Sequence, residues 1–230
     1  MRIGIMCSIP IEMKYFNLNC DSSQNLGDLT FFKKKKFPHE LIIVESGIGK
    51  VNAAIVSTLL IKTYKCNLLI FSGVAGSIDP EMRLGEVILG ESLIQYDYGV
   101  LENGELKVFR AGKIPMGSFN GNPDFKLDPK IKKLIKKQLP DLRMGKILTG
   151  DTFINCINTR NFLFEKFRAQ VVDMESGAVA QVSEKFGVKN VIIRSVSDFA
   201  GADKTKISAR NLNKASKISF ETVNEILKIF

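Results

Sequence analysis

Residues 41–54 read LIIVESGIGKVNAA and residues 68–76 read LLIFSGVAG. Each stretch opens with an apolar run, typical of a strand buried on both faces, and continues into glycines that punctuate the chain. Between the two runs, residues 51–64 place Ala53, Ala54 and Leu59 on the inner side of a predicted helix. A buried strand, a helix and another buried strand in this order predict a sheet whose two faces are covered by helices.

The same alternation extends in both directions along the chain. Further strands are expected over residues 2–7, 30–37, 86–89, 146–149, 171–174 and 191–196, and further helices over 130–137, 161–167, 176–186 and 207–229. Residues 96–129 are rich in glycine and proline, so we expect them to be mostly loop. The chain contains no linker, repeat or low-complexity tract. We therefore expect one domain over residues 1–230, a three-layer α/β/α sandwich with a mixed, mostly parallel central sheet.

Length and composition set bounds on the class of protein. The chain has 230 residues, of which 45% are hydrophobic and 25% are charged, values typical of a soluble globular protein with a proper core. Trp is absent, so stacking on a ligand falls to the 16 Phe and 4 Tyr. We expect no transmembrane helix, because no run of about 18 apolar residues occurs. We also expect no signal peptide, which makes the cytoplasm the simplest compartment.

The net charge of +9 permits binding to nucleic acid or another polyanion. The lysines concentrate at Lys33–Lys36 and in Lys130–Lys137, where Ile131, Leu134 and Ile135 recur at helical spacing. This spacing favours a solvated surface helix with an apolar seam. No nucleic-acid-binding motif accompanies the charge, so a polyanion-binding surface protein is the less favoured alternative.

The cysteines and the histidine do not form a metal-binding pattern. The four cysteines are Cys7, Cys20, Cys66 and Cys156, far apart and without CxxC spacing, and His39 stands alone. Reduced thiols are therefore expected. We expect no metal and no cofactor.

Three acids and one arginine lie near the ends of predicted strands. Glu12 follows the first strand, Glu175 follows the strand at 171–174, and Arg194 and Asp198 lie in and after the last strand. Three of the four have a structural alternative: a helix-end acid at Glu12, a helix N-cap at Asp198, and a core ion pair at Arg194. Residues 73–76 (GVAG) also have two readings, a tight strand-to-helix turn or a close backbone approach to a ligand.

Carboxylates grouped in this way suit the cleavage of an N-glycosidic bond. The leaving base must be protonated and a water must be activated on the opposite face of an oxocarbenium-like sugar. One carboxylic acid and one carboxylate perform these two steps, and a third carboxylate can hold ribose hydroxyls.

At these residues the chain resembles the bacterial 5'-methylthioadenosine/S-adenosylhomocysteine nucleosidases over nearly its whole length. The carrying motifs are RIGI with Glu12 and, in order, ESGIGKVNAA at 45–54, SGVAG at 72–76, GDTFIN at 150–155, VDMESGA at 172–178 and RSVSD at 194–198. The resemblance implies hydrolysis of 5'-methylthioadenosine and S-adenosylhomocysteine, with 5'-deoxyadenosine as a further candidate, in methionine salvage and methyl-cycle detoxification. It also implies a nucleoside phosphorylase-like fold, a cytoplasmic homodimer and a small nucleoside substrate.

The resemblance assigns the catalytic roles to the three acids. Glu12 is the general base that activates water, Asp198 is the general acid that protonates adenine N7, and Glu175 binds the ribose 2'- and 3'-hydroxyls. The substrate-binding set comprises Gly76, Phe153, Ile154, Met174, Glu175, Arg194, Ser197, Ile9, Ile48 and Val74. Within it, Phe153 stacks on adenine, the backbone of Ile154 reads the adenine edge, and Met174 packs on the sugar. Arg194 supports Glu175 or the water site, and Ile9 and Ile48 flank the alkylthio group.

Two departures concern the sugar and its 5' end. The family often has a hydroxyl residue in place of Val74, whose side chain cannot donate that hydrogen bond, and residues 96–121 match poorly where a partner subunit completes the 5' pocket. A nucleoside phosphorylase of the same fold is the main alternative. The sequence near Glu12 and Gly76 shows no arginine to bind phosphate, which favours hydrolysis.

Overall fold

The computed structural model describes residues 1–16, 20–113, 122–201 and 208–230. The strands are β1 (Arg2–Cys7), β2 (Ser22–Leu26), β3 (Leu29–Lys36), β4 (His39–Glu45), β5 (Leu68–Ser77), β6 (Val87–Gln95), β7 (Gly99–Glu102), β8 (Glu105–Val108), β9 (Phe125–Lys126), β10 (Arg143–Thr149), β11 (Val171–Asp173) and β12 (Lys189–Asp198). The helices are α1 (Pro10–Met13), α2 (Lys50–Lys62), α3 (Pro129–Gln138), α4 (Ile157–Phe167), α5 (Ser176–Phe186) and α6 (Ala209–Leu227).

The central sheet is mixed, as predicted. Its strand order is β11-β10-β6-β12-β5-β1-β4-β3-β2, with β9 paired to β6. Parallel pairing joins β4, β1, β5 and β12, whereas β12–β6 and β3–β4 are antiparallel. Strand β11 pairs with β10 and also, antiparallel, with β5, so the sheet curls back on itself. The carboxyl ends of β1, β5 and β12 therefore meet at one edge, where α/β sheets place their ligands.

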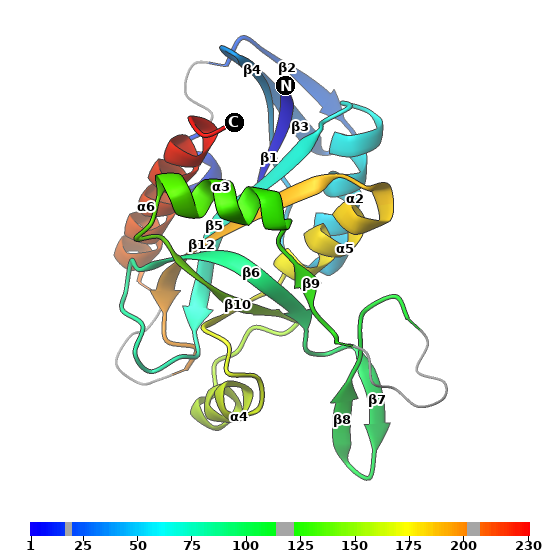
Figure 1. Cartoon of the computed structure of the whole chain (residues 1–230), viewed down its shortest axis with the longest axis vertical. Coiled ribbons are helices and arrows are strands. Elements are labelled where there is room, and N and C mark those ends of the chain that lie inside the picture. The colour runs from blue at the N-terminus through cyan, green and yellow to red at the C-terminus, as the bar shows by residue number, and fades with distance from the viewer. Residues whose placement is uncertain (17–19, 114–121, 202–207) are drawn as a thin grey trace.

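Residues along the central strands alternate between two hydrophobic cores, because successive side chains point to opposite faces. Ile3 and Ile5 of β1 belong to the core shared with α1, α3 and α6, while Met6 belongs to the core shared with α2 and α5. Strand β5 repeats the pattern, with Leu68 and Ile70 on the first side and Leu69 and Phe71 on the second. Figure 1 shows α6 on one side of the sheet and α2 with α5 on the other. The predicted α/β/α layering is confirmed.

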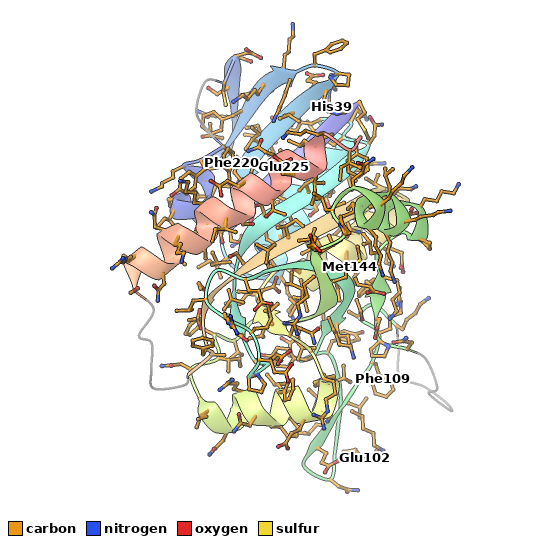
Figure 2. The ribbon with its side chains drawn as sticks, turned by 60° about the vertical axis from the view of Figure 1, so that its left-hand side comes forward. His39, Glu102, Phe109, Met144, Phe220 and Glu225 are labelled. Carbon is orange, nitrogen blue, oxygen red and sulfur yellow. The ribbon has the colours of Figure 1, made fainter. Side chains whose placement is uncertain are left out.

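Packing against α6 positions the short helix α1. The Phe220 ring on α6, labelled in Figure 2, lies 4.9 Å from the Phe16 ring, edge to face, and 5.8 Å from the Tyr15 ring. The Tyr15 hydroxyl also donates to Asn213 Oδ1 at 2.9 Å. A helix of four residues has little stability of its own, so these contacts set the place of Glu12 within it.

Several local predictions need correction. The alternative of a tight turn at residues 73–76 is wrong, because β5 continues through them to Ser77, which is fully buried. The loop-rich stretch contains a hairpin, β7–β8, that projects from the sheet with Glu102 at its tip (Figure 2), and the short strand β9. Strand β2 was not predicted. The expected helix start at Ile207, together with residues 114–121 of the loop, lies outside the described residues, and α6 is observed from Ala209.

Helix α3 has the predicted surface character. Ile131 and Ile135 are buried, and its side chains Lys133, Lys136 and Lys137 are exposed. Asp128 caps the helix, because its carboxylate accepts the backbone N–H groups of Lys130 and Ile131. None of the helices in the described ranges has both the length and the apolar character needed to cross a bilayer.

Candidate active site

A cavity of about 220 Å³ opens at the sheet edge where β1, β5 and β12 end. The predicted site residues that line it are Ile9, Glu12, Ile48, Val74, Gly76, Phe153, Ile154, Met174, Glu175, Ser197 and Asp198. Arg194 is the one predicted site residue outside the lining, and it lies fully buried behind it. Residues from distant motifs therefore meet in one pocket.

The carboxylate of Glu12 is held by three backbone amides. Its Oε2 accepts the N–H of Ser8 at 2.7 Å and of Ile9 at 3.3 Å, and its Oε1 accepts the N–H of Val74 at 2.8 Å. Burial raises the pKa of Glu12, while the Arg194 guanidinium and these amides act in the opposite direction. The structural alternative for Glu12, an acid at a helix end, is also confirmed. Glu12 lies in the first turn of α1, and its side chain accepts the backbone N–H of Ile9. Fixed on one side of the cavity, Glu12 keeps Oε1 able to accept a further hydrogen bond.

Arg194 connects the acids from behind the cavity. Its Nε donates to Asp173 Oδ2 at 2.7 Å and its Nη2 to Glu175 Oε2 at 3.4 Å, so the predicted pairing with a core acid is confirmed. The guanidinium carbon lies 3.9 Å from the centroid of the Phe71 ring. The third nitrogen, Nη1, is buried without a hydrogen-bond partner among the described protein atoms.

The free nitrogen of Arg194 faces the catalytic candidate Glu12 across Gly73. A Cβ on Gly73 would stand 2.2 Å from Arg194 Nη1 and 2.5 Å from Glu12 Oε1. No arginine is close to Glu12 in the sequence, but one is close to it in the structure. The register of β12 against β5 places Arg194 beside Gly73, so the prediction that Glu12 has no neighbouring arginine was wrong. A glycine is needed at this position because any side chain would separate the guanidinium from the carboxylate.

Glu175 lies between the guanidinium and the start of α2. Its Oε1 accepts the Gly49 N–H at 2.9 Å, in addition to the Arg194 contact. The pKa of Glu175 is raised to about 7, chiefly because the carboxyl group is buried; Arg194 opposes the rise and Asp173 adds to it. A carboxyl group of this kind exchanges its proton near neutral pH.

Asp198 occupies the end of β12 and does not cap a helix, so the N-cap alternative is wrong. The N-cap of α6 is Ser208. Asp198 Oδ2 accepts the Ser197 hydroxyl at 2.8 Å and Oδ1 accepts the Ala200 N–H at 2.9 Å. Gly76 allows this packing, since a Cβ there would stand 3.0 Å from Asp198 Oδ1.

The remaining lining is largely apolar. Ile154 is buried, whereas Phe153 and Ile48 at the mouth are 55% and 53% exposed. Sequence reasoning missed Leu212, which enters the cavity from α6, and Ala200 after β12. The amphipathic pattern of the last helix marked Leu212 only as an apolar residue, and nothing local could indicate which apolar residue reaches the site.

The lining contains acidic side chains and no basic ones among the residues described. Glu12, Asp173, Glu175 and Asp198 line the cavity, and no Lys, Arg or His does so among the residues described. Across the same described ranges, no group of three or more His, Cys, Asp or Glu is arranged to hold a metal ion. A fixed carboxylate, further acids and an apolar wall suit a nucleoside that develops positive charge on its sugar.

Comparison with known proteins gives consistent matches. Residues 2–228 match the phosphorylase superfamily. A 5'-methylthioadenosine/S-adenosylhomocysteine nucleosidase of Mycobacterium bovis is 31% identical over 223 residues, covering 88% of each chain. Two solved Helicobacter pylori proteins are each 26% identical at a TM-score of 0.87 over all of this chain: a native futalosine hydrolase, 98% covered, and a 5'-methylthioadenosine/S-adenosylhomocysteine nucleosidase with butyl-thio-DADMe-Immucillin-A, 99% covered.

Proposed function

The chain belongs to the phosphorylase superfamily and, within it, to the 5'-methylthioadenosine/S-adenosylhomocysteine nucleosidases, and we infer that it hydrolyses the N-glycosidic bond of such nucleosides. The products are adenine and the 5-substituted ribose. The observation that carries this inference is the set of acids around one cavity, in which three amides fix Glu12 and Asp198 lies at the end of β12.

The proposed roles are those that the family resemblance implies, and the contacts of each acid are compatible with them. Glu12 Oε1 accepts a proton from the attacking water, which Arg194 Nη1 helps to hold, because both atoms face the same point beside Gly73. Asp198 protonates the departing adenine at N7, and Glu175 binds the ribose hydroxyls. Preorganised groups of this kind stabilise a transition state without rearranging during the reaction.

The apolar residues would hold the substrate around this centre. Phe153 stacks on adenine, the Ile154 backbone reads its edge, and Met174 packs on the sugar. At the other end, Ile9 and Ile48 flank the 5' substituent. Val74 adds no hydroxyl beside the sugar, and its contribution is the backbone N–H that it donates to Glu12.

Hydrolysis is favoured over phosphorolysis by the charge of the cavity. Phosphate is an anion at neutral pH and would need free cationic donors at the sugar. The charged side chains of the described lining are all acids, and Arg194, which lies buried behind the lining, contacts two of them and has one nitrogen, Nη1, left beside Glu12. Purified protein should therefore release adenine and methylthioribose from methylthioadenosine in phosphate-free buffer, and strict dependence on phosphate with a sugar-1-phosphate product would refute hydrolysis.

The 5' substituent is the next property to measure. Relatives named for methylthioadenosine, S-adenosylhomocysteine and futalosine share this fold. The partly exposed Ile48 leaves that end of the cavity accessible. A panel containing these nucleosides and 5'-deoxyadenosine, scored by the purine base released, ranks them directly.

Assembly and location complete the proposal. We take residues 1–230 as one nucleosidase domain that acts as a homodimer in the cytoplasm. Exposed apolar side chains around the start of α2 support a protein interface there, because Val51 is 70% and Ile55 is 49% exposed. All four cysteines are free thiols, which agrees with a reducing compartment. Light scattering on a size-exclusion column tests the dimer, and a monomer at micromolar concentration would contradict it.

A further inference from the structure

A closed ring of polar contacts joins three segments beside the cavity. The Lys50 ammonium lies 2.8 Å from both carboxylate oxygens of Asp97 and 3.6 Å from Asp151 Oδ2. The Lys50 backbone N–H donates to Asp151 Oδ1 at 2.8 Å, and the Asp151 N–H donates to Asp97 Oδ2 at 2.9 Å. The ring therefore links the start of α2, the end of β6 and the loop after β10.

The position of Lys50 is unfavourable in isolation. A cation in the first turn of a helix opposes the helix dipole, and α2 has no acidic residue in its first turn. The Lys50 side chain is only 19% exposed, so its charge needs partners. Asp97 and Asp151 provide them, and Asp151 also caps α2, whose N-cap Gly49 has no side chain to do so.

Residues next to Lys50 and Asp151 in the sequence contact or line the cavity. Gly49, the residue before Lys50, donates its N–H to Glu175 Oε1 at 2.9 Å. Thr152, Phe153 and Ile154 directly follow Asp151 and line the cavity, and Phe153 and Ile154 are the residues assigned to adenine. The ring thus fixes the spacing between the carboxylate assigned to ribose and the loop assigned to adenine.

We propose that Lys50, through Asp97 and Asp151, is a positioning residue that sets the distance between the ribose-binding and purine-binding parts of the site. This rests on the proposed nucleosidase function. Lys50 does not act on the chemical step, because the amides that hold Glu12 and the groups that hold Asp198 lie outside the ring. Loss of Lys50 weakens binding of the ground state and the transition state alike, which raises KM and leaves kcat nearly unchanged.

The test compares Lys50→Met with Lys50→Arg and with Lys132→Met, a matched control that breaks the ion pair between Lys132 on α3 and Glu91 on β6. With methylthioadenosine, Lys50→Met should raise KM by about tenfold and change kcat by less than about threefold. Lys50→Arg should restore most of the affinity, because a guanidinium can bridge two carboxylates. Lys132→Met should leave both constants unchanged. A loss of kcat at constant KM, or a change in thermal stability alone, would overturn the proposal.

A second variant keeps the test decisive if Lys50→Met does not fold. Asp97→Asn should give a similar rise in KM, and the double variant should lose no more affinity than the weaker-binding single variant, because the residues act as one unit. Additive losses would reject the ring. Adenine affinity measured by calorimetry should fall in the same variants. If the wild-type protein binds adenine but cleaves no nucleoside, the proposed function fails while the ring is still tested.

Discussion

Replacing Gly73 with alanine should disable the site while leaving the fold intact. The new Cβ would stand 2.2 Å from Arg194 Nη1, 2.5 Å from Glu12 Oε1 and 2.9 Å from Glu12 Cδ. Non-bonded contacts to carbon are normally about 3.5 Å or more, so both groups must retreat by roughly 1 Å. Gly73 is not among the described glycines with positive φ, so its backbone accommodates alanine.

The expected loss is worked from that displacement. A misplacement of about 1 Å costs on the order of 100-fold in rate, which is about 2.7 kcal/mol in activation free energy. The assay is steady-state release of adenine from methylthioadenosine, with thermal unfolding measured in parallel. We expect a kcat about 100 times lower, because Glu12 and Arg194 would no longer face the same water.

Gly4→Ala is the matched control for crowding within the sheet. Its Cβ would stand 2.9 Å from Leu69 Cδ2 and 3.0 Å from Leu60 Cδ1, inside the core and away from the cavity. Overpacking of this kind typically lowers stability by about 1–3 kcal/mol and should leave kcat unchanged. If Gly73→Ala kept kcat within about threefold of wild type, the close pairing of Glu12 and Arg194 would have no catalytic importance.

Other predictions concern the three acids. Glu12→Gln should nearly abolish turnover while calorimetric affinity for methylthioadenosine stays largely intact, and near-full activity would remove Glu12 as the base. Asp198→Asn should also stop adenine release in single-turnover experiments, since an amide is a poor acid, and retained release would reassign that role. The empty protein should lose stability as pH rises from about 4.5 to about 7, because folded Glu175 keeps its proton up to a pKa of about 7 while an unfolded glutamate ionises near 4.5. Thermal unfolding across this range should show the trend in wild type and a weaker trend in Glu175→Gln, and equal trends would contradict it.

The parts of the fold that could be predicted are those whose burial is visible in the sequence. The apolar runs of β1, β4 and β12 are buried on both faces, so they indicate strands without tertiary information. Strand β2 is exposed throughout and has no apolar alternation, so it gave no signal. The extension of β5 through Gly73 and Gly76 depends on pairing with β12 and β11, which distant residues determine.

The site also has features that the sequence predicts and features that depend on tertiary structure. Acids after apolar strands could be singled out, because charge at a core edge is unfavourable unless it is used or paired. The sequence predicted an ion pair between Arg194 and a core acid but did not identify Asp173 as the partner. Its approach to Glu12 was implied only by the family resemblance, which assigned Arg194 to Glu175 or the water site, because the residues alone do not reveal the register that places Arg194 opposite Gly73. The ring around Lys50 could not be predicted from the sequence either, because Asp97 and Asp151 lie 47 and 101 residues after Lys50 in the chain.

The charge arrangement of the cavity explains why the acids suit this reaction. Arg194 contacts Asp173 and Glu175 and leaves only Nη1 toward Glu12, so one cation serves three buried acids. Burial raises the pKa of Glu12 and of Glu175, and Arg194 only partly offsets this, so burial disfavours their ionised forms when no substrate is bound. An oxocarbenium-like ribose brings positive charge into the same cavity and so stabilises the ionised carboxylates. The acids therefore interact more favourably with the transition state than with the neutral nucleoside, and this difference is what accelerates bond cleavage.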